Sequence, residues 1–524
     1  MIKLKIDNQA VEVPKGTTVL EACQSIGINI PTMCYLKGYS NRPSCMVCLV
    51  KDTRNGNLHP SCALPVSQGM DIISTDDEII KARKEALELL LSDHVGDCEA
   101  PCRIACPAYM DIPKMNRLIA KSDFRQALEL VKEEIALPLI LGYICSAPCE
   151  KVCRRKDADQ AISICQLKKF VAAEDLQTDE PFLPVCKKPA NKTVAIIGSG
   201  PAGLSCAWHL QREGYSCTLF DQNQMAGGSL RNNTMKKELP IEALDAEINI
   251  IRNMGAEFRT NTEITAEYFE NTLYNKYDAV VIAIGNSESP LINQLGFHYN
   301  EKGTLANRDT YETGVSGVFA CGSVINPLSM AVKAIAQGKE AVHSVIQYLS
   351  DEQIHKMKRP FNSKFGRLQT DEVLEYLKEA SSNEITIPEA GDLSGFNPEE
   401  AIKEAERCMH CDCRKPDSCK LRIYANEYGA DRKKYLYGER KTLTKQVQHE
   451  FVIFETEKCI RCSLCVDITT QNKELTGLTQ IGRGFDVKIA VPFNKSLGEA
   501  LTITAQKCIE ACPTGALSYK IDNY

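Results

Sequence analysis

The sequence contains a single tryptophan, no excess of basic residues and no apolar run long enough to form a membrane helix. Its richest apolar stretch, residues 135–144, is about half of the roughly 18 residues that a spanning helix needs, and it contains Pro138. A net charge of -6 offers no general attraction to nucleic acid or to an anionic membrane. We therefore expect no membrane span and no nucleic-acid partner.

The N-terminal stretch MIKLKIDNQAVEV alternates apolar and polar residues and lacks the apolar core and cleavage site of a secretory signal. The chain nevertheless carries 25 cysteines, most of them in short-spaced groups. In a protein without a signal, such cysteines are typical of metal or redox sites rather than of disulfides. We expect a cytoplasmic protein whose cysteines hold metal clusters.

A chain of 524 residues has room for about three to five domains. Thr17 or Thr18 is expected to cap a helix within a small β-grasp domain, and residues 75–92 have apolar residues at helical spacing. The predicted fold is multidomain, α/β and α+β. The expected segments are a β-grasp domain (1–75), a helical domain (76–187), an α/β domain (192–350), a linker (351–400), a four-cysteine module (401–445) and a C-terminal module (446–524).

The first cysteine group has the form C-x10-C-x2-C-x13-C and comprises Cys34, Cys45, Cys48 and Cys62. Four thiolates on one loop are what a 2Fe-2S cluster requires, whereas a structural zinc site usually uses two short cysteine pairs. The spacing resembles the ferredoxin-like N-terminal domain of the large iron-sulfur subunit of NADH-quinone oxidoreductase and of NAD-linked hydrogenases.

The next groups resemble two families at once. The pattern His94-x3-Cys98 is similar to the histidine and cysteine that begin a 4Fe-4S site in that same large subunit. Two runs with Cys-x3-Cys spacing, Cys98/Cys102/Cys106 and Cys145/Cys149/Cys153, resemble the glutamate synthase small subunit and the N-terminal domain of dihydropyrimidine dehydrogenase. The resemblance implies interleaved ligands. One 4Fe-4S cluster would use His94, Cys98, Cys102 and Cys153, and the other would use Cys106, Cys145 and Cys149.

The second of these clusters lacks an obvious fourth ligand. The resembling families place Glu or Gln where this chain has Lys168, and an ammonium is a poor iron ligand. Cys165 or Gln166 can take the role, with Cys165 favoured. Ordinary helix packing is the alternative explanation for both residues.

The glycine pattern Gly198-x-Gly200-x2-Gly203 follows the predicted strand 193–197 and opens a predicted helix, and Asp221 ends the next strand. This context is typical of a dinucleotide site, in which glycines admit a pyrophosphate and the acid binds a ribose hydroxyl. Together with Gly228, Gly285, Gly322 and Ser323, the segment resembles the FAD domain of the glutamate synthase small subunit.

Two departures from that family bear on function. Ser323 stands where the family has an acid that binds the flavin's ribityl chain. Only 36 residues separate Gly285 from Gly322, where the family keeps an NADPH-binding domain, and the sequence has no second glycine fingerprint. We therefore do not expect direct NAD(P)H oxidation at this flavin.

Two further cysteine groups lie near the C-terminus. Cys408, Cys411, Cys413 and Cys419 form a compact loop that predicts either a 4Fe-4S cluster or one zinc ion. Cys459, Cys462, Cys465 and Cys512 resemble a two-cluster ferredoxin that has lost one site. Thr469 replaces the cysteine that would pair with Cys508, and residues 483–497 again resemble the NADH-quinone oxidoreductase subunit.

These features predict one FAD, one 2Fe-2S cluster and three to four 4Fe-4S clusters. Because no constellation for independent organic chemistry is present, we expect an electron-transfer subunit that links an NADH-oxidising flavoprotein to another redox subunit, of hydrogenase, formate dehydrogenase or bifurcating transhydrogenase type. The alternatives are a free-standing FAD enzyme that reduces ferredoxin, and a zinc-binding scaffold.

Overall fold

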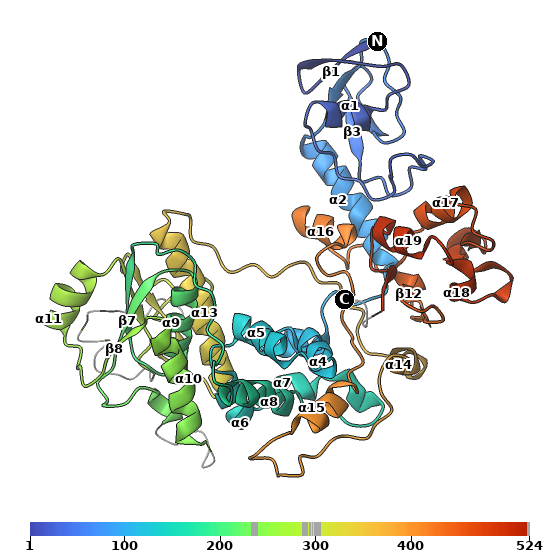
Figure 1. Ribbon diagram of the computed structural model, residues 1–524. Helices are drawn as coiled ribbons and strands as arrows, with labels where there is room; N and C mark the ends of the chain where they lie inside the picture. The colour runs from blue at the N-terminus through green and yellow to red at the C-terminus, as the bar shows by residue number, and fades with distance from the viewer. Residues whose placement is uncertain (232–238, 286–291, 293–294, 296, 298–304, 521–524) are drawn as a thin grey trace. The chain divides into compact units, whose positions relative to one another are not determined.

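The computed structural model of the chain describes residues 1–231, 239–285, 292, 295, 297 and 305–520 (Figure 1). The chain divides into two units. Each unit is compact, although its residues come from separate segments of the sequence. Unit 1 comprises Met1–Ala100, Pro360–Glu379 and His410–Tyr524. Unit 2 comprises Pro101–Arg359 and Ala380–Met409.

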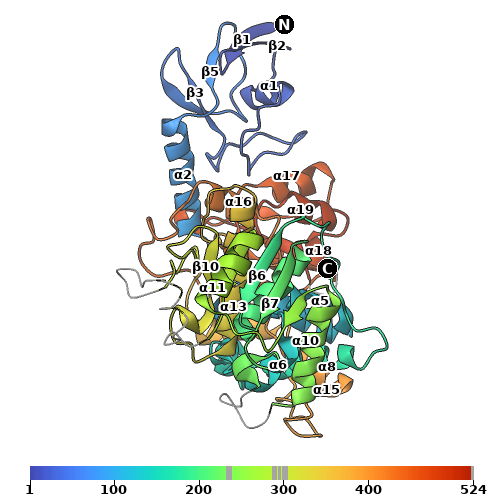
Figure 2. The ribbon, with the colours of Figure 1, turned by 90° about the vertical axis from the view of Figure 1, so that its left-hand side faces the viewer.

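Unit 1 begins with a five-stranded sheet in the order β2-β1-β5-β3-β4, with helix α1 beside it (Figure 2). Its elements are β1 (Ile2–Ile6), β2 (Gln9–Val13), α1 (Val19–Ser25), β3 (Leu49–Asp52), β4 (Asn57–Pro60) and β5 (Asp71–Ile73). β1 pairs antiparallel with β2 and parallel with β5. Thr18 caps α1 through a reciprocal capping box with Glu21, which confirms the predicted cap.

Helix α2 (Asp77–Ser92) leads out of this sheet, in agreement with the predicted helix. Asp76 caps it by accepting a hydrogen bond from the Ile79 N–H, and acids in its first turn suit the helix dipole. The buried Arg83 guanidinium donates to the carbonyls of Leu49 and Ser74, which holds the helix against β3.

The C-terminal part of unit 1 contains a three-stranded antiparallel sheet, β11-β12-β15, and a hairpin, β13-β14. Helices α17 and α19 pack against each other. The elements are α14 (Thr370–Leu377), α16 (Lys420–Glu427), β11 (Lys445–Gln446), β12 (Val452–Glu455), α17 (Leu464–Gln471), β13 (Thr479–Ile481), β14 (Lys488–Ala490), α18 (Leu497–Ala500), α19 (Ala505–Ala511) and β15 (Leu517–Tyr519).

Unit 2 begins with short helices whose apolar faces share one core. They are α3 (Pro101–Ala105), α4 (Ile112–Ala120), α5 (Phe124–Glu134), α6 (Pro138–Ile144), α7 (Pro148–Lys151), α8 (Ile164–Leu176) and, from later in the chain, α15 (Pro398–Ala405). Helix α8 packs against α5 and α6, and α3 packs against α7. Cysteines of both predicted groups therefore reach one helical layer.

The α/β part of unit 2 is a parallel sheet in the order β10-β9-β6-β7-β8. Its elements are β6 (Thr193–Ile197), α9 (Pro201–Arg212), β7 (Ser216–Phe220), α10 (Ile241–Asn253), β8 (Glu257–Arg259), α11 (Ala266–Tyr268), β9 (Ala279–Ile282), β10 (Val318–Ala320) and α13 (Ala331–Leu349). Trp208 Nε1 donates to the Lys132 carbonyl at 3.1 Å, so the helical layer and the α/β part share a core.

The described residues contain no helix that combines the length and apolar character needed to cross a bilayer. Residues 351–400, expected to be a linker, include α14 and the first residues of α15. Part of the interval between Gly285 and Gly322, on which the missing nicotinamide domain was predicted, lies outside the described residues. The predicted domain boundaries stay predictions.

Candidate functional site

The first cysteine group of unit 1, here the N-terminal thiol set (Cys34, Cys45, Cys48 and Cys62), is buried and converges. The sulfurs of Cys34 and Cys45 lie 3.3 Å apart. Hydrogen bonds from the thiols of Cys45 and Cys62 hold the pKa of Cys34 far below its usual value, and Cys48 bonds Cys62. Four thiols linked by hydrogen bonds, with the negative charge favoured at Cys34 and disfavoured at Cys45 and Cys62, fit the donor set of a 2Fe-2S cluster.

A second set in unit 1 joins residues that lie far apart in the sequence. The Cys413 N–H donates to the Cys98 carbonyl at 3.1 Å. Burial, and then the nearby charge of Cys413, raises the pKa of Cys98 to about 11, and both cysteines likewise act on Cys419. We call His94, Cys98, Cys413 and Cys419 the His94 set.

His94 has the properties of a neutral metal ligand. Its side chain is buried, and Nδ1 has no hydrogen-bond partner among the described residues. Burial, assisted by the charges of Lys458 and Arg432, lowers its pKa to about 4, so the imidazole is neutral at pH 7. A neutral ring with an orphaned, buried nitrogen fits the fourth position of a cluster held by three thiolates.

The surroundings of the His94 set include residues that sequence reasoning missed. A Cβ at Gly515 would lie 2.4 Å from Cys413 Sγ, and a Cβ at Gly96 would lie 2.7 Å from Lys458 Cε. Lys458 is buried and pairs with Glu455 at 2.6 Å. No local pattern announces these roles, because each depends on a partner from a distant segment.

The C-terminal thiol set comprises Cys459, Cys462, Cys465 and Cys512. After burial, the charge of Cys512 is the largest influence that raises the pKa of Cys459 and of Cys462. Cys508, by contrast, lies in the apolar core, with its thiol 3.9 Å from the Cys465 carbonyl oxygen. The contacts of Cys512 therefore support its predicted place in this set.

The three sets of unit 1 meet in one apolar cluster. It contains Cys34 and Cys45 of the first set, Cys419 of the second and Cys462 of the third, packed with Leu87, Leu91, Met33, Val47, Leu421 and Leu464. We call this cluster the apolar bridge. Groups bound by these cysteines would lie close to one another, separated by packed side chains rather than by water.

In unit 2, Cys106, Cys145, Cys149 and Cys165 form what we call the Cys106 set. The Cys165 thiol hydrogen-bonds the thiols of Cys145 and Cys149, and all four cysteines act electrostatically on Lys168. The structure thus brings Cys165, the favoured candidate for the fourth ligand, together with the other predicted thiols, and its role as a ligand stays a prediction.

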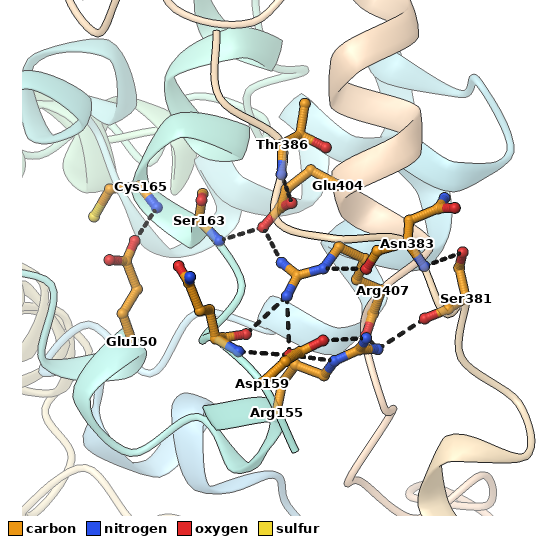
Figure 3. A network of polar contacts seen from close by, with 11 residues as sticks. Glu150, Arg155, Asp159, Ser163, Cys165, Ser381, Asn383, Thr386, Glu404 and Arg407 are labelled. Atoms are coloured by element: carbon orange, nitrogen blue, oxygen red, sulfur yellow. Dashed lines mark hydrogen bonds and ion pairs between the residues drawn. The ribbon is translucent and has the colours of Figure 1, made fainter. Parts of the chain in front are cut away.

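A network of polar contacts joins residues 155–163 to residues 381–407 (Figure 3). The Arg155 guanidinium donates to the Arg407 and Ser381 carbonyls, each at 2.9 Å, and pairs with Asp159 at 2.6 Å. Arg407 in turn pairs with Glu404 at 2.8 Å. Because Arg155 follows Cys153 closely and Arg407 precedes Cys408, the network holds these two cysteine segments side by side.

These contacts favour a grouping that differs from the predicted one. Cys98 was expected to join Cys102 and Cys153, but in unit 1 it lies with Cys413 and Cys419. Within the described residues, no three His, Cys, Asp or Glu side chains have the spacing that a single bare ion needs. A multi-iron cluster joins its thiolates across several atoms, and the ligand sets stay predictions.

The glycine fingerprint has the geometry of a dinucleotide site. Gly198 has φ +104°, and a Cβ there would lie 2.4 Å from the Ala283 carbonyl oxygen. At Gly203 a Cβ would lie 2.0 Å from the Gly198 oxygen, whereas Gly200, which begins α9, faces open space. A pyrophosphate can therefore approach the helix N-terminus, so the residues fit FAD.

Two polar contacts shape the rest of this site. Both Asp221 oxygens accept hydrogen bonds, one from the Ser199 N–H at 2.8 Å and the other from the Asn223 N–H at 2.9 Å. Asp221 therefore shapes the glycine loop, and its ribose contact stays a prediction.

The Gly322 N–H donates to Gln337 Oε1 at 2.8 Å, a contact that the sequence did not suggest. Gly228 packs on Gly200, Gly285 has φ +86°, and Ser323 is half-buried beside Gly322.

Five segments match known domain families. Residues 1–77 match a 2Fe-2S iron-sulfur cluster binding domain, and residues 81–180 match the 4Fe-4S domain II of dihydropyrimidine dehydrogenase. Residues 196–260 match an NAD(P)-binding Rossmann-like domain, and residues 232–338 match the pyridine nucleotide-disulphide oxidoreductases. Residues 449–518 match the ferredoxin-like domain of NADH-quinone oxidoreductase subunit 3.

Similar proteins include oxidoreductase subunits. The NADPH-Fe(3+) oxidoreductase subunit beta of Geobacter sulfurreducens is 35% identical over 39% of this chain and 31% of its own length. The NADP(+)-dependent formate dehydrogenase subunit beta of Moorella thermoacetica is 35% identical over 36% and 29%. The glutamate synthase [NADPH] small chain of Bacillus subtilis is 33% identical over 36% and 40%.

Each alignment thus spans less than half of the relative's length. The domain matches, by contrast, extend from the N-terminus to residue 518. The chain is therefore an iron-sulfur flavoprotein that joins a 2Fe-2S domain, a dihydropyrimidine dehydrogenase-type 4Fe-4S domain, a pyridine nucleotide-disulphide oxidoreductase-type FAD domain and a subunit 3-type ferredoxin-like domain.

Proposed function

We propose that this chain is an electron-transfer subunit that relays electrons between an NADH-oxidising flavoprotein and a second redox subunit in the cytoplasm. The observation that carries the proposal is the apolar bridge, in which cysteines from three ligand sets share one core. Electron transfer between redox centres becomes steeply slower with distance, so close packing of successive ligands is what a relay requires. An active site that only transforms an organic substrate would not need a series of closely spaced redox centres.

The cofactor types support the same proposal. A bound flavin exchanges one or two electrons, whereas iron-sulfur clusters exchange one at a time. The names of the relatives refer to NADPH or NADP(+) as the nucleotide, and to Fe(3+) reduction, formate dehydrogenation or glutamate synthesis as the reaction. Two of the three are beta subunits. We infer a partner of hydrogenase, formate dehydrogenase or bifurcating transhydrogenase type.

We further propose a revised distribution of ligands. In unit 1, the N-terminal thiol set would hold the 2Fe-2S cluster, and the His94 set and the C-terminal thiol set would each hold a 4Fe-4S cluster. In unit 2, the Cys106 set would hold one 4Fe-4S cluster, and Cys102, Cys153 and Cys408 would supply ligands to another. Cys411 keeps its predicted role as a metal ligand. Because Cys408, Cys413 and Cys419 bind iron in this distribution, the 408–419 loop has no complete ligand set for zinc.

Iron analysis of the anaerobically purified chain tests this distribution. The four 4Fe-4S clusters and one 2Fe-2S cluster of this distribution correspond to about 18 iron atoms per chain, whereas about 14 would mean that one of the 4Fe-4S sets binds no cluster. About two iron atoms accompanied by several zinc ions would instead favour the scaffold.

The flavin is expected not to accept hydride directly. Efficient transfer needs a nicotinamide ring held against the flavin, and the sequence carries one dinucleotide fingerprint, at Gly198–Gly203. In anaerobic stopped-flow spectroscopy, dithionite should bleach the flavin of the isolated chain, whereas NADH and NADPH should reduce it only slowly and without saturation.

An NADH-oxidising partner should restore rapid reduction of the clusters. Saturable bleaching by either nucleotide alone would contradict the proposal. Saturable reduction by a small organic substrate, with onward transfer to ferredoxin, would favour the free-standing flavoenzyme.

A further inference from the structure

A buried lysine in unit 2 has no conventional partner. Lys168 lies on α8, three residues after Cys165, and is only 4% exposed. Within the described residues, its ammonium forms neither an ion pair nor a hydrogen bond to an oxygen. Its neighbour Lys169 differs, because Lys169 Nζ donates to the Asp392 and Leu393 carbonyls at 2.5 and 2.8 Å.

The charge of Lys168 acts on two carboxylates, Glu150 and Glu247, but both accept hydrogen bonds from other groups. Glu150 Oε1 accepts from the Cys165 N–H at 2.8 Å (Figure 3). The Glu247 oxygens accept from the N–H groups of Leu139 and Ile140 at 2.9 and 3.0 Å. Neither carboxylate therefore neutralises the ammonium directly.

Burying an unpaired ammonium costs several kcal/mol, so native proteins place an anion beside it. The groups around Lys168 are the four thiols of the Cys106 set. The charges of these thiols act on the buried ammonium, and thiols are anionic when they bind a cluster, so the bound thiolates would supply the negative charge that Lys168 lacks.

Cys165 is well placed to be one of these ligands. It lies in the first turn of α8, whose 13 residues direct the positive end of the helix dipole toward a thiolate. Its sulfur is hydrogen-bonded to both Cys145 and Cys149. Gln166, the competing candidate, faces the other way, because its Nε2 donates to the Asp392 carbonyl at 3.2 Å.

We propose that Cys165 is the fourth ligand of the cluster held by Cys106, Cys145 and Cys149, and that the buried Lys168 ammonium offsets the charge of this added thiolate. A neutral fourth ligand would leave the cluster less negative by one charge. Lys168 restores that balance from outside the ligand sphere. Because reduction adds an electron, a fixed positive charge here raises the reduction potential of this cluster.

The ligand assignment is tested with Cys165→Ala in the full chain, purified anaerobically. We expect loss of one 4Fe-4S signal from the EPR spectrum of the reduced protein, or its replacement by a three-iron signal. Gln166→Ala should keep the signal, and Cys186→Ala, which alters a thiol outside every set, serves as the general control. Loss of the signal in Gln166→Ala and its retention in Cys165→Ala would overturn the assignment.

The charge role is tested by EPR-monitored redox titration. Lys168→Met should shift the midpoint potential of this one cluster to a more negative value, whereas Lys168→Arg, which keeps the charge, should leave it near that of the parent. Lys169→Met, a matched neighbour whose ammonium is already hydrogen-bonded to carbonyls, should also leave it unchanged. Equal shifts in Lys168→Met and Lys168→Arg, or no shift in either, would refute the charge role.

This inference rests on the proposed clusters but fails separately from them. If the Cys106 set held no cluster, the parent would lack the corresponding signal and iron, and the proposed distribution would fail. If the signal is present in the parent and unaffected by the variants, only the roles of Cys165 and Lys168 fail.

Discussion

Units 1 and 2 each bury a lysine beside a set of cysteines, and the two lysines differ in their partners. Lys458 in unit 1 forms an ion pair with Glu455 at 2.6 Å, and both side chains are fully buried. Lys168 in unit 2 has no oxygen partner among the described residues. The first charge forms an ion pair with a carboxylate, whereas the second is surrounded by the thiols of the Cys106 set.

Two of the buried glutamates, Glu455 in unit 1 and Glu247 in unit 2, repeat this contrast. Burial disfavours the Glu455 carboxylate, but the charges of Lys458, Lys445 and Arg414 outweigh burial and lower its pKa to about 2. Burial raises the pKa of Glu247 to about 7, because Lys132 and two backbone N–H groups compensate only in part. In unit 1 the buried carboxylate is therefore stabilised by several buried cations, whereas in unit 2 the burial of Glu247 is compensated only in part.

The largest expected effect comes from breaking the pair in unit 1. Lys458→Met removes the closest cation of the buried Glu455 carboxylate and leaves Arg414, at 3.4 Å, as its remaining ion pair, so we expect a loss near the lower end of the about 3–5 kcal/mol that breaking a buried pair costs. Lys168→Met removes a charge that has no carboxylate partner and should cost far less. Anaerobic denaturant unfolding of both variants, followed by a signal from each unit, measures the difference.

A second variant checks the cause of that loss. Lys458→Met combined with Glu455→Met removes both charges and should recover a large part of the lost stability. If the double variant were no more stable than Lys458→Met alone, the lost packing of the lysine stem, rather than the unpaired carboxylate, would explain the result.

Local structure was largely predictable from the sequence. The strand 193–197, the helix capped by Thr18 and the helix within residues 75–92 are all present, because each is encoded by short-range periodicity and capping residues. The multidomain fold also followed, since each cysteine spacing or glycine fingerprint marks one domain. These signals depend on neighbours in the chain.

The partners of Cys98 could not be read in the same way. Its spacing from Cys102 and Cys106 is regular, so local pattern alone assigns it to them. The contact with Cys413 spans most of unit 2 in sequence and depends on how the chain returns to unit 1. Gly515, which gives Cys413 Sγ its space, carries no sequence signal for the same reason.

Gly515→Ala should have an intermediate effect and acts on unit 1 alone. The added methyl would lie 2.4 Å from Cys413 Sγ, so the sulfur or the backbone must move. Overpacking of this kind costs about 1–3 kcal/mol, and we expect weakened iron retention at the His94 set. Gly314→Ala, where an added methyl meets no atom within 4 Å, is the matched control.

EPR spectroscopy and iron analysis after mild chelation measure this effect. The signal assigned to the His94 set should decline first, while the signal of the Cys106 set in unit 2 is retained. Equal loss from both sets would show that the methyl acts on global stability and not on Cys413.

The smallest expected effect concerns Glu247, whose charge is poorly compensated. Its pKa in the folded chain is about 7, above the ordinary value of 4.5. Below the ordinary value both states hold the proton, and the carboxyl carries no electrostatic penalty. Between pH 4.5 and about 7 the unfolded chain loses the proton while the folded chain keeps it, so stability falls with increasing pH over this range and levels off above it. Glu247→Gln cannot titrate and should lack this fall.

Thermal unfolding of parent and variant between pH 5 and 8 isolates the effect. The amide of Glu247→Gln has one acceptor oxygen for two N–H groups of α6, which lowers stability equally at every pH. On top of this constant offset, the variant should gain on the parent as the pH rises, by on the order of 1 kcal/mol. A difference independent of pH would mean that Lys132 and the helix N-terminus fully stabilise the carboxylate, and the electrostatic contrast between the glutamates of the two units would disappear.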